Sequence, residues 1–268
     1  MQNNPKEIPN FIFNNSLETT PGLTIDDLNR YLSAVKTIDD VLISKEKMVE
    51  GLYLSDCLNG LRKIPDESID LIITEPSINF FNNNQQSTLK DYYKWNQEWL
   101  FESKRILKNS GSIYLMTNWK FSSMYHSLLS NIFKIRSRII WRNRSSNLEN
   151  EKEWINDTSD IWFASKTEEY VFREGKGDNV NIENNFQTHN QSNLWIDIPK
   201  TSNNYGKYSQ KIYSRILKSS SFSLNWILDP FMALGDVGVA SKNLGRRFIG
   251  FEEDKDYLLL AMKRIDRS

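Results

Sequence analysis

Two short segments of the sequence place an acid and a proline directly after an apolar run. Residues 73–80 read ITEPSINF and follow the residues SIDLI, and residues 227–236 read ILDPFMALGD. Short apolar runs of this kind are typical of buried strands, and ligands of open α/β sheets bind beyond the carboxyl ends of the strands. Glu75 and Asp229 are therefore candidates for carboxylates that serve a chemical site.

The second segment continues in a way that favours a cofactor site. After Asp229 come a turn that contains Gly235, a helical stretch, and the strand RRFIGFEED, which ends in acids that include Glu252. A strand, a tight turn, a helix, a second strand and an acid, in this order, are what a nucleotide-type cofactor site needs. The polar group of the ligand would face the amides of the turn.

Helices and strands alternate from residue 51 onward. This alternation predicts an α/β fold with a doubly wound, mainly parallel, Rossmann-like sheet covered by helices on both faces. The expected strands are 51–56, 68–74, 109–116, 136–143, 160–166 paired with 169–174, 225–231 and 246–254. The expected helices are 57–64, 92–108, 121–133, 208–221, 239–245 and 255–265.

Residues 1–50 are interpreted as an N-terminal extension and residues 51–268 as the main domain. Apolar residues spaced by three and four over 25–42 predict an amphipathic helix with Thr24 as N-cap, packed either on its own domain or on a partner helix. Two stretches rich in Asn and Gln, 79–90 and 174–194, predict long loops inserted in the domain.

Charge and cysteine content narrow the class of protein. The 34 basic and 34 acidic residues cancel, which argues weakly against nucleic acid, although residues 134–144 and 200–218 carry no acid. Each of these basic stretches is either a solvated face or a phosphate contact. One cysteine and two histidines favour a reducing, cytoplasmic location and no metal site, and neither a membrane span nor a signal peptide is expected.

The segments taken together resemble one family. Residues 227–265 are similar to the cofactor segment of bacterial DNA amino-methyltransferases of the permuted β class, with consensus LDPFxGSGTTG and FIGxE. LYLSDCLNGLRKIPDESIDLIITEPSINF, WNQEWLFESKRILKNSGSIYLMTN and YGKYSQKIYSRIL resemble the preceding segments in the family's order. The resemblance covers residues 51–268 and implies a methyltransferase sheet. It also implies methyl transfer from S-adenosylmethionine to an exocyclic amine of adenine, or less often cytosine, in DNA.

The resemblance also implies roles for individual residues. In the acceptor motif, Glu75, Pro76, Ser77 and Ile78 stand where the family has Asp-Pro-Pro-Tyr. The implied cofactor residues are Asp56, Gln210, Lys211, Asp229, Phe231, Ala233, Gly235, Asp236 and Glu252. Of these, Glu252 would hold ribose hydroxyls or else face solvent, and Asp56 would face adenine or else cap a helix. The expected DNA-binding residues are Arg136, Arg138, Arg142, Arg144 and Lys207.

The departures from the family lie in the two turns, whereas the scaffold sequences are intact. Glu75 is one methylene longer than aspartate, and Ile78 cannot stack on a flipped base. Ala233 and Leu234 replace Gly and Ser, and Asp236 would repel the methionine carboxylate unless a cation intervenes. These changes indicate an inactive or impaired DNA-binding subunit, with cofactor binding weakened or lost, that pairs as a homodimer or with a catalytic subunit. The alternative is an active adenine-N6 methyltransferase that uses Glu75, with Phe80 as the stacking ring.

Overall fold

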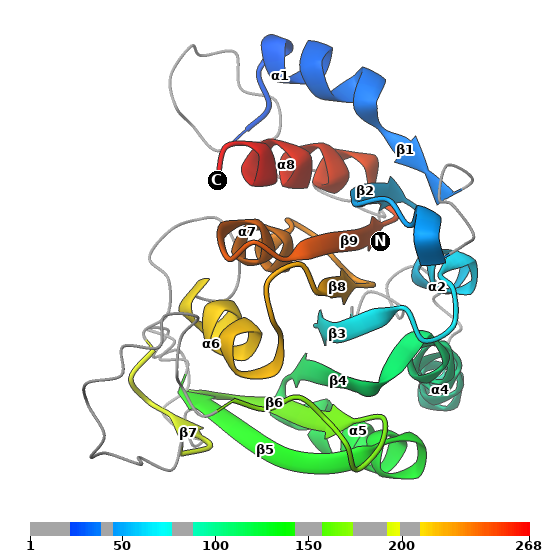
Figure 1. Cartoon of the computed structure of the whole chain (residues 1–268), viewed down its shortest axis with the longest axis vertical. Helices are drawn as coiled ribbons and strands as arrows, with labels where there is room; N and C mark the ends of the chain where they lie inside the picture. The colour runs from blue at the N-terminus through cyan, green and yellow to red at the C-terminus, as the bar shows by residue number, and fades with distance from the viewer. Residues whose placement is uncertain (1–21, 39–44, 77–87, 143–156, 174–191, 199–209) are drawn as a thin grey trace, which may run out of the picture.

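A nine-stranded sheet runs through the computed structural model, which describes residues 22–38, 45–76, 88–142, 157–173, 192–198 and 210–268 (Figure 1). The strands are β1 Lys36–Thr37, β2 Gly51–Leu54, β3 Ile69–Thr74, β4 Leu107–Thr117, β5 Lys134–Arg142, β6 Thr158–Ser165, β7 Leu194–Trp195, β8 Trp226–Asp229 and β9 Arg247–Glu252. Their order is β1-β2-β9-β8-β3-β4-β6-β5-β7. Among these strands only β6 runs antiparallel to its neighbours, so the mainly parallel sheet is confirmed.

Helices cover both faces of this sheet (Figure 1). They are α1 Ile25–Tyr31, α2 Cys57–Lys63, α4 Leu89–Ile106, α5 Trp119–Ile132, α6 Gln210–Ser220, α7 Asp236–Asn243 and α8 Lys255–Asp266. Side chains alternate across a strand, so Ile72 packs with α2, α4 and α5 while Leu71 and Ile73 pack with α6, α7 and α8. The two resulting cores confirm the doubly wound arrangement. No helix in the described ranges has both the length and the apolarity that a membrane crossing requires.

The N-terminal helix is shorter than its apolar spacing predicts. Thr24 forms the expected N-cap, within a capping box with Asp27, but α1 ends at Tyr31 and a 3₁₀ turn follows. From Val35 the chain is extended, and Lys36 and Thr37 pair in parallel with Tyr53 and Leu54 of β2. Pairing with the sheet edge therefore outweighs the helical periodicity of residues 35–38, and residues 39–44 lie outside the described part.

Further differences from the prediction arise elsewhere in the chain. The segment 169–173 forms no strand, because β6 is already paired on both sides by β4 and β5. Helix α4 begins three residues early, because Thr88 and Asp91 form a capping box there. Leu194 and Trp195 form β7 within and beside the expected loop 174–194, most of which lies outside the described residues.

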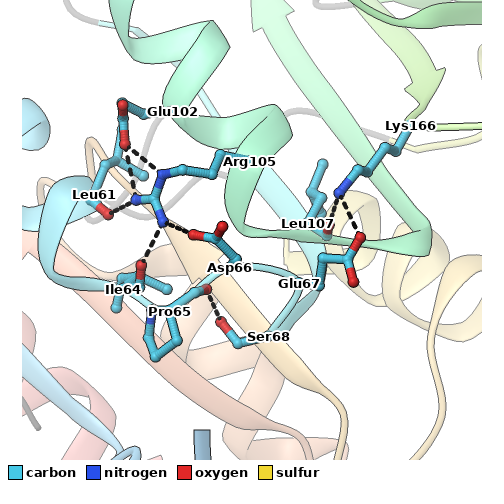
Figure 2. Close-up of polar contacts among 10 residues, drawn as sticks. All are labelled: Leu61, Ile64, Pro65, Asp66, Glu67, Ser68, Glu102, Arg105, Leu107 and Lys166. Atoms are coloured by element: carbon cyan, nitrogen blue, oxygen red, sulfur yellow. Dashed lines mark hydrogen bonds and ion pairs between the residues drawn. The ribbon is translucent and has the colours of Figure 1, made fainter. Parts of the chain in front are cut away.

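Arg105 joins α4 to the carboxyl end of α2 (Figure 2). Its guanidinium donates to the carbonyl oxygens of Leu61 at 2.9 Å and Ile64 at 3.0 Å, and to the Glu102 carboxylate at 2.9 Å. It also donates to the carboxylate of Asp66. The Ile64 carbonyl, at the C-cap of α2, gains a donor in this way, and the Leu61 carbonyl gains a second donor beside the N–H of Ile64. One guanidinium therefore fixes the end of α2 against α4.

Replacing Arg105 by alanine is expected to lower the free energy of unfolding by about 2 kcal/mol, because the Ile64 carbonyl and the Glu102 carboxylate lose their Arg105 donor. The Leu61 carbonyl keeps only the backbone N–H of Ile64. Urea unfolding followed by circular dichroism measures this change. Lys94→Ala, at an exposed position of the same helix, is the matched control and should change stability by less than about 0.5 kcal/mol. Equal effects of the two substitutions would contradict the structural role of Arg105.

Candidate functional site

The two candidate turns open at one edge of the sheet, because β3 and β8 are parallel neighbours. The hydroxyl of Thr74, the last residue of β3, donates to the carboxylate of Asp229, the last residue of β8, at 2.9 Å. Half-buried Glu75 and buried Pro76 follow Thr74 directly, whereas Ser77 and Ile78 lie outside the described residues. A single hydrogen bond thus ties the acceptor segment to the expected cofactor strand.

The turn of residues 230–235, here called the β8–α7 turn, keeps its left-handed backbone without its first glycine. Ala233 has φ of +45° and Gly235 has φ of +74°. A left-handed conformation costs a non-glycine residue about 1–2 kcal/mol, so the surroundings must hold Ala233 in place. The backbone N–H of Ala233 donates to the carboxylate of Glu252 at 2.9 Å. The other oxygen of Glu252 accepts from the N–H of Asp254, also at 2.9 Å.

Asp236, the first residue of α7, has a cationic partner that sequence reasoning missed. The guanidinium of Arg264 in α8 forms an ion pair with this carboxylate, and both side chains are largely buried. Arg264 also donates to the carbonyl of Leu234, and the amide of Gln210 donates to Asp236. The positive charge of Arg264 therefore offsets the expected repulsion between Asp236 and a ligand carboxylate. The two residues are in contact although they lie 28 residues apart in the sequence.

Burial raises the pKa of two carboxyls at this edge. The pKa of Asp229, which is 4% exposed, rises to about 7, and the charges of Glu252 and Asp236 add to the rise. The pKa of Glu252 also rises to about 7, again chiefly through burial, with Asp254 and Glu253 contributing. A nearby cation or hydroxyl donors would thus stabilise the ionised form of these carboxyls.

These raised pKa values predict a stability that falls with pH. The carboxyls of Asp229 and Glu252 hold their protons more tightly in the folded protein than in the unfolded chain. Their contribution to the free energy of unfolding is therefore complete below about pH 4 and is lost as pH rises through about 7. Urea unfolding midpoints between pH 5 and 8 should therefore decline, and Asp229→Asn should flatten the decline. Exposed Asp26→Asn is the control and should leave the slope unchanged. A slope that is the same in all three proteins would contradict the assignment.

An aromatic face of α4 lies against the β8–α7 turn. The ring of Phe231 lies 5.4 Å from that of Trp95 and 5.2 Å from that of Trp99, between ring centroids. Tyr92 extends this face, stacked on Trp95 at 5.8 Å. Phe231 is one of the expected cofactor residues, whereas Tyr92, Trp95 and Trp99 were not singled out from the sequence. Their spacing by three and four residues carries the signal.

A buried hydrogen-bonded group lies beside this face, between α4 and α5. The hydroxyl of Tyr125 donates to the side-chain oxygen of Asn96 at 2.9 Å and lies 3.0 Å from the hydroxyl of Tyr92. Burial raises the pKa of Tyr125 well above its ordinary value, and the charges of Tyr92 and Glu75 add to the effect. The hydroxyls of Tyr92 and Tyr125 and the amide of Asn96 thus form a buried polar group between α4 and α5.

The other expected cofactor residues are placed as follows. The carboxylate of Asp56 accepts from the backbone N–H of Asn59 at 3.0 Å and caps α2, as one of its two interpretations has it. Gln210 and Lys211 begin α6, with Lys211 exposed. The described residues contain no group of three His, Cys, Asp or Glu side chains that could hold a metal ion.

The basic stretch of residues 134–144 acquires acids in three dimensions. Arg136 pairs with Glu168 at 2.7 Å, and Arg138 pairs with Asp160 at 3.0 Å. Arg142 likewise pairs with Asp157 at 3.2 Å. The stretch itself contains no acid, but acids of β6 and of the residues beside it lie next to its arginines in the folded protein. Arg144 and Lys207 lie outside the described residues.

Comparison with known proteins agrees with the geometry. The model of the protein family described as DNA methylase (N6_N4_Mtase) matches residues 69–263 of this chain. The chain is 28% identical to the type II methyltransferase M.BglII of Bacillus subtilis, over 78% of this chain and 67% of that protein. It is also 28% identical to the DNA adenine methyltransferase YhdJ of Escherichia coli, over 79% and 81%. The crystal structure of the M1.HpyAVI–SAM complex has a TM-score of 0.61 and 24% identity, over 81% of this chain and 98% of that one.

Proposed function

The chain belongs to the DNA methylase family, and from this premise we propose that it binds S-adenosylmethionine and DNA but transfers methyl groups weakly or not at all. In this proposal it serves as a DNA-binding subunit beside a catalytic methyltransferase or a second copy of itself. The cofactor half and the acceptor half of the proposal depend on different residues.

The residues at the carboxyl ends of β8 and β9 fit the cofactor. S-adenosylmethionine carries a sulfonium and an ammonium group, which suit the buried carboxyls of Asp229 and Glu252. Each carboxylate oxygen accepts more than one hydrogen bond, so Glu252 can take ribose hydroxyls in addition to the N–H of Ala233. Arg264 offsets the charge of Asp236, which supports retained binding in spite of the altered turn.

The acceptor residues limit the reaction. When bound, the cofactor supplies an electrophilic methyl group, and the protein must orient an amine that is a poor nucleophile toward it. Glu75 would accept a hydrogen bond from that amine, but its extra methylene displaces the carboxylate by about 1 Å, which costs roughly 100-fold in rate. The lost ring at Ile78 removes about 1–3 kcal/mol of base stacking.

The observation that carries the proposal is the hydrogen bond between Thr74 and Asp229. Glu75 follows Thr74 directly, and this supports the proposal that the acceptor motif begins at residue 75, beside the expected cofactor strand. In this proposal the protein combines a retained cofactor site with a defective acceptor site.

The active alternative, an adenine-N6 methyltransferase that uses Glu75, is favoured by the same Asp236–Arg264 pair, because a retained cofactor is the first requirement for catalysis. YhdJ is named as an adenine methyltransferase, which makes adenine the first target to test.

Two measurements on the full chain test the proposal. Calorimetric titration with S-adenosylmethionine should show saturable micromolar binding. Incubation with tritiated cofactor and genomic DNA should give at most trace incorporation, roughly 100-fold below that of the variant Glu75→Asp/Ser77→Pro/Ile78→Tyr. Incorporation as fast as in that variant, and abolished by Glu75→Ala, would establish the active alternative. Lack of cofactor binding would overturn the first half of the proposal.

A further inference from the structure

Leu234 of the β8–α7 turn packs with the N-terminal segment. It contacts a cluster formed by Leu23 and Tyr31, with Leu259 and Leu260 of α8, all at most 5% exposed. Serine stands at the matching position of the family consensus. The leucine therefore adds an apolar link between the expected cofactor turn and residues that precede the main domain.

The N-terminal helix is fixed to α8 by buried polar contacts. α1 lies along α8 (Figure 1), and Asp27 of α1 is 1% exposed. Its carboxylate pairs with Lys263 at 2.7 Å and with Arg267. The hydroxyl of Tyr31 donates to Asp266 at 2.8 Å. A buried carboxylate with two cationic partners defines one docked position of α1, since displacement would leave charges unpaired.

Helix α8 contacts both the β8–α7 turn and α1. Arg264 follows Lys263 directly, so adjacent residues contact the turn and α1 respectively. The guanidinium of Arg264 binds both the carbonyl of Leu234 and the carboxylate of Asp236. Strained backbone such as that of Ala233 persists only when its surroundings fix it from several sides. Leu234 brings α1 into that set of surroundings.

We propose that residues 22–34 are a positioning element of the β8–α7 turn, and that cofactor affinity depends on the docking of α1 against α8. The proposal deepens the proposed function, since it rests on that turn as the cofactor site. The positioning residues are Asp27 and Tyr31, which act through α8 and Leu234.

The test compares the full-length wild type with the double variant Asp27→Ala/Tyr31→Ala. Hydrogen exchange read by mass spectrometry should show faster exchange of the amides of residues 233–239, with β3 and β4 unchanged. The Kd for S-adenosylmethionine should rise about tenfold, within the usual range of coupling between sites. Tyr31→Phe, which removes one hydrogen bond, should shift both readouts in the same direction by less, and it serves if the double variant does not fold.

Arg105→Ala is the matched destabilised control, because its contacts lie at the α2–α4 junction. It should leave exchange at 233–239 and cofactor affinity unchanged. Faster exchange in α1 without any change in the turn would overturn the proposal. If the wild type bound no cofactor, the proposed function would fail, and the exchange comparison would still decide whether α1 positions the turn.

Discussion

Replacing Arg264 by methionine is expected to lower the free energy of unfolding by about 3 kcal/mol, the low end for breaking a largely buried ion pair. The substitution leaves the Asp236 carboxylate, which is 13% exposed, without its cation and close enough to Asp229 to raise the pKa of that group. It also removes a donor from the carbonyl of Leu234. Urea unfolding followed by tryptophan fluorescence measures the loss.

Two further variants separate the ion pair from a general effect of charge. Lys255→Met removes a cation from an exposed position of the same helix and should cost less than about 0.5 kcal/mol. The double variant Asp236→Thr/Arg264→Met removes both charges and should recover part of the loss, because no buried charge is then left unpaired. A loss in Arg264→Met no larger than in Lys255→Met would contradict the importance of the pair for the turn.

Restoring the acceptor motif should produce the largest change in activity. The triple variant Glu75→Asp/Ser77→Pro/Ile78→Tyr is expected to raise methyl incorporation into DNA at least about 100-fold over wild type, since it corrects the carboxylate position and supplies a stacking ring. The cofactor turn is left as it is, because Arg264 already offsets Asp236. Transfer of tritiated methyl groups to genomic DNA measures the gain.

The single variant Ser77→Pro restores neither the acid nor the ring, and it should remain at the wild-type rate. A triple variant that binds cofactor yet transfers no faster than wild type would show that the defect extends beyond these positions. A wild type already as fast as the triple variant would instead favour the active alternative.

The parallel sheet and most of its helices could be predicted from the sequence, because their signals are local. Apolar runs such as residues 69–73 and the periodic spacing in α4 report burial on one or both faces directly. The errors at residues 35–38 and 169–173 arose because these segments depend on a distant partner. Lys36 and Thr37 are extended because they pair with the free edge of β2. Residues 169–173 form no strand because β6 is already paired on both sides.

Most of the element order, the family, and the acids and altered residues of the two turns could be predicted from the sequence, since they follow from residue types at short spacings. Which groups the charged side chains contact depends on the tertiary structure. It paired Asp236 with Arg264, gave acids to Arg136, Arg138 and Arg142, and set the N-terminal helix against α8. Electrostatic energy depends on separation in space and on burial, and neither can be calculated from separation along the chain.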